Sequence, residues 1–192
     1  MEQILFINAC VREGSRTREL AEHLLGQLKG AITEVNLDQE KPIPMDRAML
    51  RMRDDAVKSC NFGHPMLRYA EQFAEADTIV IAAPYWDLSF PALLKAYLEQ
   101  ITVSGVTFRY TEQGVPESLC RVKQLFYVTT AGGSIQWDFG FSYVEALARG
   151  FFGVPEVVCL KAERLDIIGA DVDGILAQAK SSVDRWISEK ST

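Results

Sequence analysis

The chain has 192 residues, of which 48% are hydrophobic and 24% are charged, and its formal net charge is −6. These values are typical of one soluble globular domain that covers residues 1–192. There is no lysine- or arginine-rich run, and no apolar run approaches the roughly 20 residues that span a bilayer, so nucleic acid and membranes are not expected as partners.

Cysteine usage favours a reduced, cytoplasmic protein. The four cysteines form no C-x-x-C pair, and only two histidines exist to join them, so we expect no metal site. Cys10 lies in a predicted ligand loop. Two interpretations remain open for it, a small packed side chain or a redox-sensitive thiol.

Apolar patterns predict five strands that alternate with helices. The predicted strands cover residues 4–8, 32–37, 78–83, 124–129 and 156–160. The predicted helices cover residues 17–28, 66–76, 91–103, 139–152 and 172–190. Gly30 is expected to end the first helix, and Ser89 to cap the helix that begins near Phe90. Residues 105–119 are predicted to be irregular. Residues 38–59 are predicted to form a charged excursion with some helix, which serves as a lid or as a dimer arm.

In the strand predicted at residues 78–83 every residue after Thr78 is apolar, which is typical of a strand buried on both faces. Pro84 ends it because proline fixes φ and lacks a backbone N–H. The alternation of strands and helices predicts a doubly wound α/β fold with a five-stranded parallel sheet and helices on both faces. Five strands suit the flavodoxin-like order 2-1-3-4-5.

The loops after strands one, three and four would then meet at one edge of the sheet, where such folds bind ligands. In the first loop, Gly14 permits a tight turn, and Ser15, Thr17 and nearby arginines at a helix start suit a phosphate. The alternative is an ordinary N-cap at Ser15 with solvated arginines. Neither G-x-x-x-x-G-K nor G-x-G-x-x-G occurs, which argues against an NTPase and a Rossmann NAD site.

The other two loops supply flat aromatic side chains and backbone hydrogen-bond donors. Tyr85 and Trp86 follow the third strand and suit a planar ligand, although aromatic residues often simply cap a core. Gly132 and Gly133 follow the fourth strand and allow backbone N–H groups to approach a ligand closely. The alternative is that they form a plain flexible turn. Together the three loops suit a planar ring with a phosphate tail, so FMN is the natural candidate.

Several segments also resemble a known family. They are Ile81–Trp86, Pro91–Lys95, Ser104–Tyr110 and Thr129–Ser134, with Pro42–Pro44 as a further match. By their order and spacing, the chain resembles the flavodoxin-like NAD(P)H:quinone oxidoreductases, which include the FMN-dependent NADH-azoreductases. The resemblance implies a homodimer with FMN at two interface sites, FAD being less favoured. It also implies ping-pong transfer of two electrons from NAD(P)H to a quinone or an azo compound.

The resemblance also assigns site residues. Those for the FMN phosphate are Ser15, Arg16 and Thr17. Those that line the ring are Pro84, Tyr85, Trp86, Asp87, Leu88, Thr130, Ala131, Gly132 and Gly133. The backbone N–H groups of Gly132 and Gly133 would stabilise the reduced ring, and no side chain is assigned a catalytic role.

This chain departs from the family pattern at Asp87, where relatives commonly carry an amide; a carboxylate there is expected to lower the flavin potential. Its phosphate loop is also richer in arginine. Two other functions remain open: a flavodoxin-type electron carrier that does not oxidise NAD(P)H directly, and a flavin-free regulatory protein on the same fold.

Overall fold

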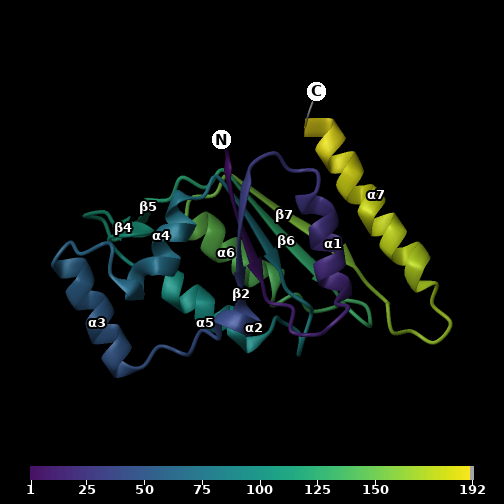
Figure 1. The fold of residues 1–192 in the computed structure, drawn as a ribbon, viewed down its shortest axis with the longest axis horizontal. Helices are drawn as coiled ribbons and strands as arrows, with labels where there is room; N and C mark the ends of the chain where they lie inside the picture. Colours follow the sequence, from purple (N-terminus) through teal and green to yellow (C-terminus); the bar gives the residue numbers. More distant parts are fainter. Residues whose placement is uncertain (191–192) are drawn as a thin grey trace.

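A five-stranded parallel sheet forms the centre of the computed structural model, which describes residues 1–190 (Figure 1). Its strands are β1 (Gln3–Asn8), β2 (Ala31–Asn36), β3 (Thr78–Ala82), β6 (Gln124–Thr130) and β7 (Glu156–Ala162). They lie in the order β2-β1-β3-β6-β7. Counted within this sheet alone, that is the predicted order 2-1-3-4-5, so the predicted fold class is confirmed.

The central strand β3 explains why the sheet needs cover on both faces. All five of its residues are buried, and it pairs in parallel with β1 and β6. Side chains alternate across a strand, so Ile79 and Ile81 join one core cluster while Val80 and Ala82 join the other. A strand with apolar side chains on both faces is stable only between two layers of helices.

Helices supply these two layers (Figure 1). On one face lie α1 (Arg16–Leu25) and α7 (Val172–Lys190). On the other lie α4 (Arg68–Glu75), α5 (Ala92–Ile101) and α6 (Phe141–Gly150). Among the helices formed by residues 1–190, none combines the length and the apolar character needed to cross a membrane.

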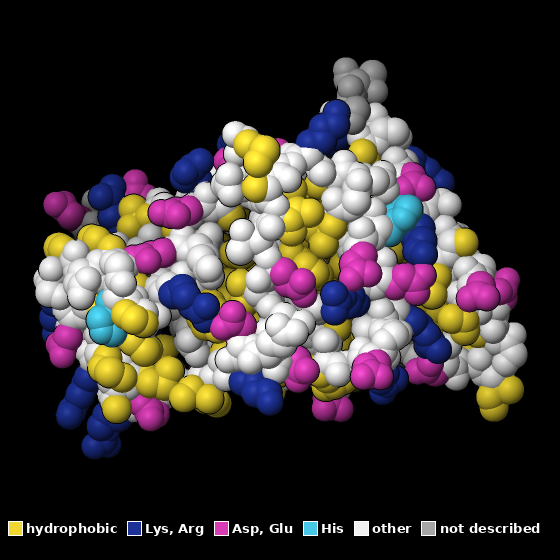
Figure 2. Space-filling model, viewed as in Figure 1, with side chains coloured by type: hydrophobic (Ala, Val, Ile, Leu, Met, Phe, Trp, Pro, Cys, Tyr) yellow, Lys and Arg dark blue, Asp and Glu magenta, His cyan; other side chains and the backbone are white. Residues whose placement is uncertain are grey.

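The predicted excursion at residues 38–59 is largely helical. It contains most of α2 (Leu37–Glu40) and all of α3 (Arg47–Lys58), and the 3-10 helix η1 (Pro65–Leu67) follows before α4. The helix α3 lies at one end of the molecule, away from the sheet (Figure 1). Hydrophobic side chains gather at this end of the surface (Figure 2), and Leu50 and Met52 are 41% and 47% exposed. Elsewhere on that face acidic and basic side chains are intermixed.

The prediction of an irregular stretch at residues 105–119 was wrong in part, because a short hairpin forms there. Its strands β4 (Phe108–Tyr110) and β5 (Pro116–Ser118) pair in antiparallel fashion. Phe108 is buried, and its ring centroid lies 4.8 Å from that of Phe151. Strands of three residues are too short for a visible alternation, so tertiary packing defines them.

Both predicted helix caps, Gly30 and Ser89, also differ from the structure. The helix α1 ends at Leu25, where the N–H of the C-cap Gly26 donates to the carbonyl of Glu22, and it does not extend to Gly30. The helix α5 begins at Ala92, after Pro91, and Ser89 does not cap it. The residue before a proline is disfavoured in the helical region, so the helix starts only after Pro91.

Candidate functional site

Loops at the carboxyl edge of the sheet surround a cavity of about 260 Å³. The predicted residues that line it are Ser15, Arg16, Thr17, Pro84, Tyr85, Trp86, Thr130, Ala131 and Gly132. The structure therefore brings the loops after β1, β3 and β6 together, as the fold required. Asp87, Leu88 and Gly133 belong to the same loops but do not line this cavity.

The first wall is the start of α1. Ser15 is its N-cap, and the Ser15 hydroxyl accepts a hydrogen bond from the Arg18 N–H at 3.3 Å. This capping role does not exclude anion binding, because the N–H groups of Arg16 and Thr17 lie in the first turn and have no acceptor within the helix. Arg12 and Arg16 line the cavity, whereas the Arg18 guanidinium pairs with Glu22 at 2.7 Å.

A buried hydrogen bond joins the first wall to the end of β6, where the third wall begins. The hydroxyl oxygens of Thr17 and Thr130 lie 2.6 Å apart, and the two residues are 1% and 9% exposed. At the end of β1, the carboxamide oxygen of the fully buried Asn8 accepts from the Cys10 N–H at 3.0 Å. These contacts fix the start of α1 relative to the sheet, because buried polar groups are stable only when they are paired.

The second wall is a tight turn after β3. The backbone groups of Trp86 and Ser89 exchange two hydrogen bonds, so Asp87 and Leu88 form the centre of a two-residue turn. Both central residues have positive φ, 49° for Asp87 and 67° for Leu88. The Tyr85 hydroxyl donates to the carbonyl of Trp137 at 2.6 Å. Loop 84–89 is therefore attached to the segment after β6.

The third wall is the loop after β6, and Gly132 of this loop lines the cavity as predicted. A Cβ at Gly132 would lie 2.3 Å from a carboxylate oxygen of Asp166. The missing side chain thus accommodates Asp166. At Gly133 a Cβ would meet nothing within 4 Å, so space remains open there.

The segment after β7 forms a fourth wall that the sequence analysis missed. Leu165 and Asp166 line the cavity, and an Asp166 carboxylate oxygen lies 2.8 Å from an Arg16 guanidinium nitrogen. The only available signal was topological: the fifth strand neighbours the fourth, so its following loop reaches the same edge. Nothing in the residue types of this loop indicates a ligand site.

Cys10 fits the packed interpretation. It is 8% exposed within a core cluster, and its thiol donates to the carbonyl of Ala82 at 3.7 Å. Burial raises the pKa of the Cys10 thiol to about 11. The side chain is therefore a neutral thiol at physiological pH, which is the unreactive form.

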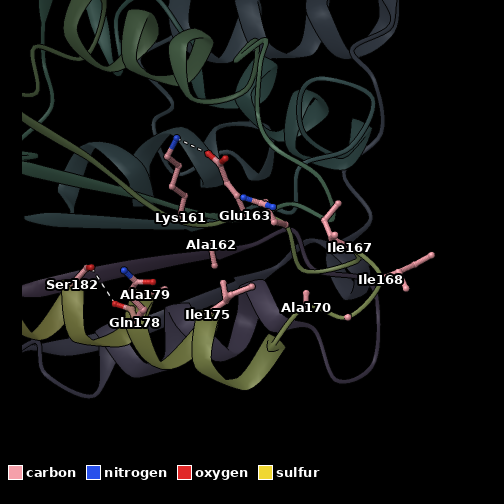
Figure 3. A pocket seen from close by; sticks show the side chains of 12 residues that line it. Lys161, Ala162, Glu163, Ile167, Ile168, Ala170, Ile175, Gln178, Ala179 and Ser182 are labelled. Carbon is pink, nitrogen blue, oxygen red and sulfur yellow. Dashed lines mark hydrogen bonds and ion pairs between the residues drawn. The ribbon is translucent and has the colours of Figure 1, made fainter.

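A larger cavity of about 750 Å³ is lined by residues of β7, of the segment after it and of α7 (Figure 3). Ala162 of β7 faces Ile175, Gln178 and Ala179 of α7 across it. Lys161 and Glu163, also among its lining residues, pair with each other at 2.6 Å. No aromatic side chain is among the described residues that line this cavity, so the smaller cavity, which Tyr85 and Trp86 line, is the better candidate for a planar ligand.

The donors around the smaller cavity fit such a ligand. The N-terminus of α1 and the arginines beside it favour an anionic group. Tyr85 and Trp86, beyond the end of β3, offer flat apolar surface, and Trp86 is 39% exposed. The Asp166 carboxylate is the one acidic side chain among the described residues that line the cavity.

Comparison with known proteins places this geometry in a family. Residues 2–187 match a family described as having a flavodoxin-like fold. An FMN-dependent NADH:quinone oxidoreductase of Coprothermobacter proteolyticus is 38% identical, over 96% of this chain and 98% of the relative. Another protein of that name, from Lachnoclostridium phytofermentans, is 37% identical over 94% of this chain and 95% of the relative.

A solved structure agrees in fold. The FMN-dependent NADH-azoreductase of Bacillus anthracis strain Ames Ancestor, solved in complex with FMN, superposes with a TM-score of 0.80 over all of both chains at 21% identity. At that identity the likeness concerns the fold alone. With the match over residues 2–187 and relatives at 38% and 37% identity over nearly the whole length, the chain belongs to the flavodoxin-like family that includes the FMN-dependent NADH:quinone oxidoreductases.

Proposed function

We propose that this protein is an FMN-dependent NADH:quinone oxidoreductase. The observation that carries the proposal is the cavity at the carboxyl edge of the sheet, with the N-terminus of α1 on one side and exposed aromatic surface on another. Relatives that match nearly the whole chain bear this name, which supports the proposal and does not favour the electron-carrier alternative.

Each loop then has a part in holding the cofactor. We assign the FMN phosphate to Ser15, Arg16 and Thr17, because the first turn of α1 offers N–H groups and Arg16 a guanidinium. We assign the ring to residues 84–88 and 130–133. FMN would supply the two-electron chemistry in this site. The N–H groups of Gly132 and Gly133 are proposed to stabilise negative charge on the reduced ring.

The acceptor is proposed to be a quinone, with azo compounds as a second class, and NADH as the donor. The printed names of the relatives support quinones and NADH, and that of the structural neighbour supports azo compounds. Donor and acceptor are proposed to use the site in turn, so we expect ping-pong kinetics. We keep NADPH as a possible second donor, to be tested beside NADH.

The assembly and its setting are also proposals. We infer that the protein is a homodimer, because large apolar side chains remain exposed beside the site: Trp86 (39%), Leu88 (48%), Trp137 (62%) and Phe139 (58%). We also propose that residues 1–192 act as one domain and that the protein works in the cytoplasm. The free state of all four cysteines is consistent with that compartment.

A coupled assay tests the function. Purified protein is freed of flavin, and NADH consumption is followed with menadione as acceptor, with and without added FMN. We expect consumption that requires protein, FMN and menadione together. An Asp173→Asn variant, which changes an exposed residue that lines neither cavity, should match the wild type. Failure of FMN to restore activity would contradict the proposal.

A further inference from the structure

The backbone fixes Asp166 beside the proposed phosphate site. Three hydrogen bonds join the segment after β7 to the loop after β6: Arg164 N–H to Gly133 O at 3.0 Å, Leu165 N–H to Ala131 O at 3.2 Å, and Asp166 N–H to Gly132 O at 2.9 Å. These bonds hold the backbone of the segment after β7 against the loop after β6. The location of the carboxylate therefore follows from the fold, and is not a chance arrangement of a free loop.

The carboxylate is turned toward the start of α1. Asp166 accepts a hydrogen bond from Nη1 of Arg16 at 2.8 Å, and the same nitrogen donates to the carbonyl of Leu165 at 3.3 Å. Gly132 leaves the space that the carboxylate fills, since a Cβ there would lie 2.3 Å from Oδ2 of Asp166. Arg16 is the first residue of α1, so this carboxylate lies where the helix dipole also favours an anion.

The Asp166 carboxylate is an anion bound to the Arg16 guanidinium beside a helix N-terminus. A phosphate in the proposed site would be bound in the same way. The carboxylate and a phosphate would therefore compete for Arg16, and two anions within one cavity repel each other. The side chains of Arg16 and Asp166 are 40% and 67% exposed, so water weakens this repulsion without abolishing it.

We propose that Asp166 is an internal competitor for Arg16, which lowers the affinity of the site for phosphorylated flavin. This inference rests on the proposed function, because it takes FMN as the ligand. It assigns Asp166 a role in tuning how tightly the cofactor is held, without any part in the redox chemistry.

Two flavins and one isosteric variant test the proposal. Quenching of flavin fluorescence gives the dissociation constants of FMN and of riboflavin, which lacks the phosphate, for the wild type and Asp166→Asn. The variant should bind FMN about three- to fivefold more tightly, with riboflavin unchanged. Asp173→Asn removes the same charge from an exposed residue outside the cavity and should leave both constants unchanged.

Arg16 provides the second arm. In an Arg16→Gln background the effect of Asp166→Asn on FMN affinity should shrink, because competition for Arg16 is gone and only the screened repulsion between the two anions remains. Asp166→Ala serves as a second charge-removing variant, and the thermal unfolding midpoint of each variant verifies that it folds.

Unchanged or weaker FMN binding by Asp166→Asn would overturn the proposal, and weaker binding would mean that the carboxylate positions Arg16 for the phosphate. Equal tightening of FMN and riboflavin would also overturn it, because the effect would not involve the phosphate. Failure of the proposed function has a different signature: the wild type would then bind neither flavin.

Discussion

Asp87 and Leu88 occupy a turn that asparagine and glycine normally fill, because both positions have positive φ. Replacing Leu88 by glycine relieves the backbone strain and should raise the free energy of unfolding by about 1 kcal/mol. The same change should weaken FMN binding, because Leu88 is a proposed ring contact. Urea denaturation and flavin fluorescence measure the two effects.

Leu88→Ala is the matched control for this prediction. It removes the same side-chain contact but retains the Cβ that makes positive φ unfavourable. It should therefore weaken FMN binding without stabilising the protein. If Leu88→Gly is no more stable than Leu88→Ala, the turn carries no strain.

The cysteines should differ sharply in reactivity. Burial raises the pKa of Cys10 to about 11 and those of Cys120 and Cys159 to about 12, whereas Cys60 is exposed. Since the thiolate is the reactive form, iodoacetamide at mildly alkaline pH should label Cys60 rapidly and the other three slowly. Peptide mass spectrometry identifies the labelled residue, and Cys60→Ser should abolish the rapid phase. Rapid labelling of Cys10 would restore the redox-sensitive interpretation.

At the scale of elements, Asp77 links the start of β3 to β1. Its carboxylate accepts a hydrogen bond from the Gln3 N–H at 3.0 Å, and this bond, with help from Lys123 and Arg121, holds its pKa below the usual value. A carboxyl with a lowered folded-state pKa stabilises the protein above its unfolded pKa of about 3.9, and this stability is lost as the pH falls through the folded-state pKa.

The prediction is a stability difference that depends on pH. Wild type should exceed Asp77→Asn in free energy of unfolding at neutral pH, and the difference should shrink in acid below about pH 3.9. Urea denaturation across this range measures it. A difference for Asp77→Asn that stays flat across this range would mean that its carboxylate gains nothing from folding.

The sequence allowed the sheet to be predicted because its strands carry their own signals. Residues 79–83 are apolar on both faces and precede a proline, so strand type and burial followed from local chemistry, and the observed end at Ala82 lies one residue before the predicted end. The hairpin of β4 and β5 lacked such signals, since Phe108 is buried by its contact with Phe151. The start of α5 was misjudged because Ser89 resembles an N-cap but pairs with Trp86 in a turn.

The site could be predicted as far as strand order alone determines it. Loops after neighbouring parallel strands must meet, which brought Ser15, Tyr85 and Gly132 to one cavity. Asp166 could not be predicted, because its position depends on hydrogen bonds between the segment after β7 and the loop after β6. The close contact of Gly132 with Asp166 could not be predicted for the same reason.

For the whole molecule we predict a homodimer of 21.5-kDa chains. Sedimentation equilibrium should give twice this mass, because the apolar side chains beside the site would otherwise remain in water. Trp137 is 62% exposed, and Trp137→Ser should weaken association. Ile168→Ser, at a fully exposed residue of the segment after β7, is the control and should remain dimeric. A monomer that binds FMN fully would contradict the dimer.

The central claim is that the loops at the carboxyl edge of the sheet form a flavin site that accepts electrons from NADH and passes them to a quinone. Anaerobic titration of the FMN-loaded protein tests it most directly, with the visible flavin absorbance as readout. We predict that one equivalent of NADH bleaches the flavin and that one equivalent of menadione then restores its colour. A flavin that stays oxidised with NADH, or that bleaches but is not reoxidised by the quinone, would contradict the account.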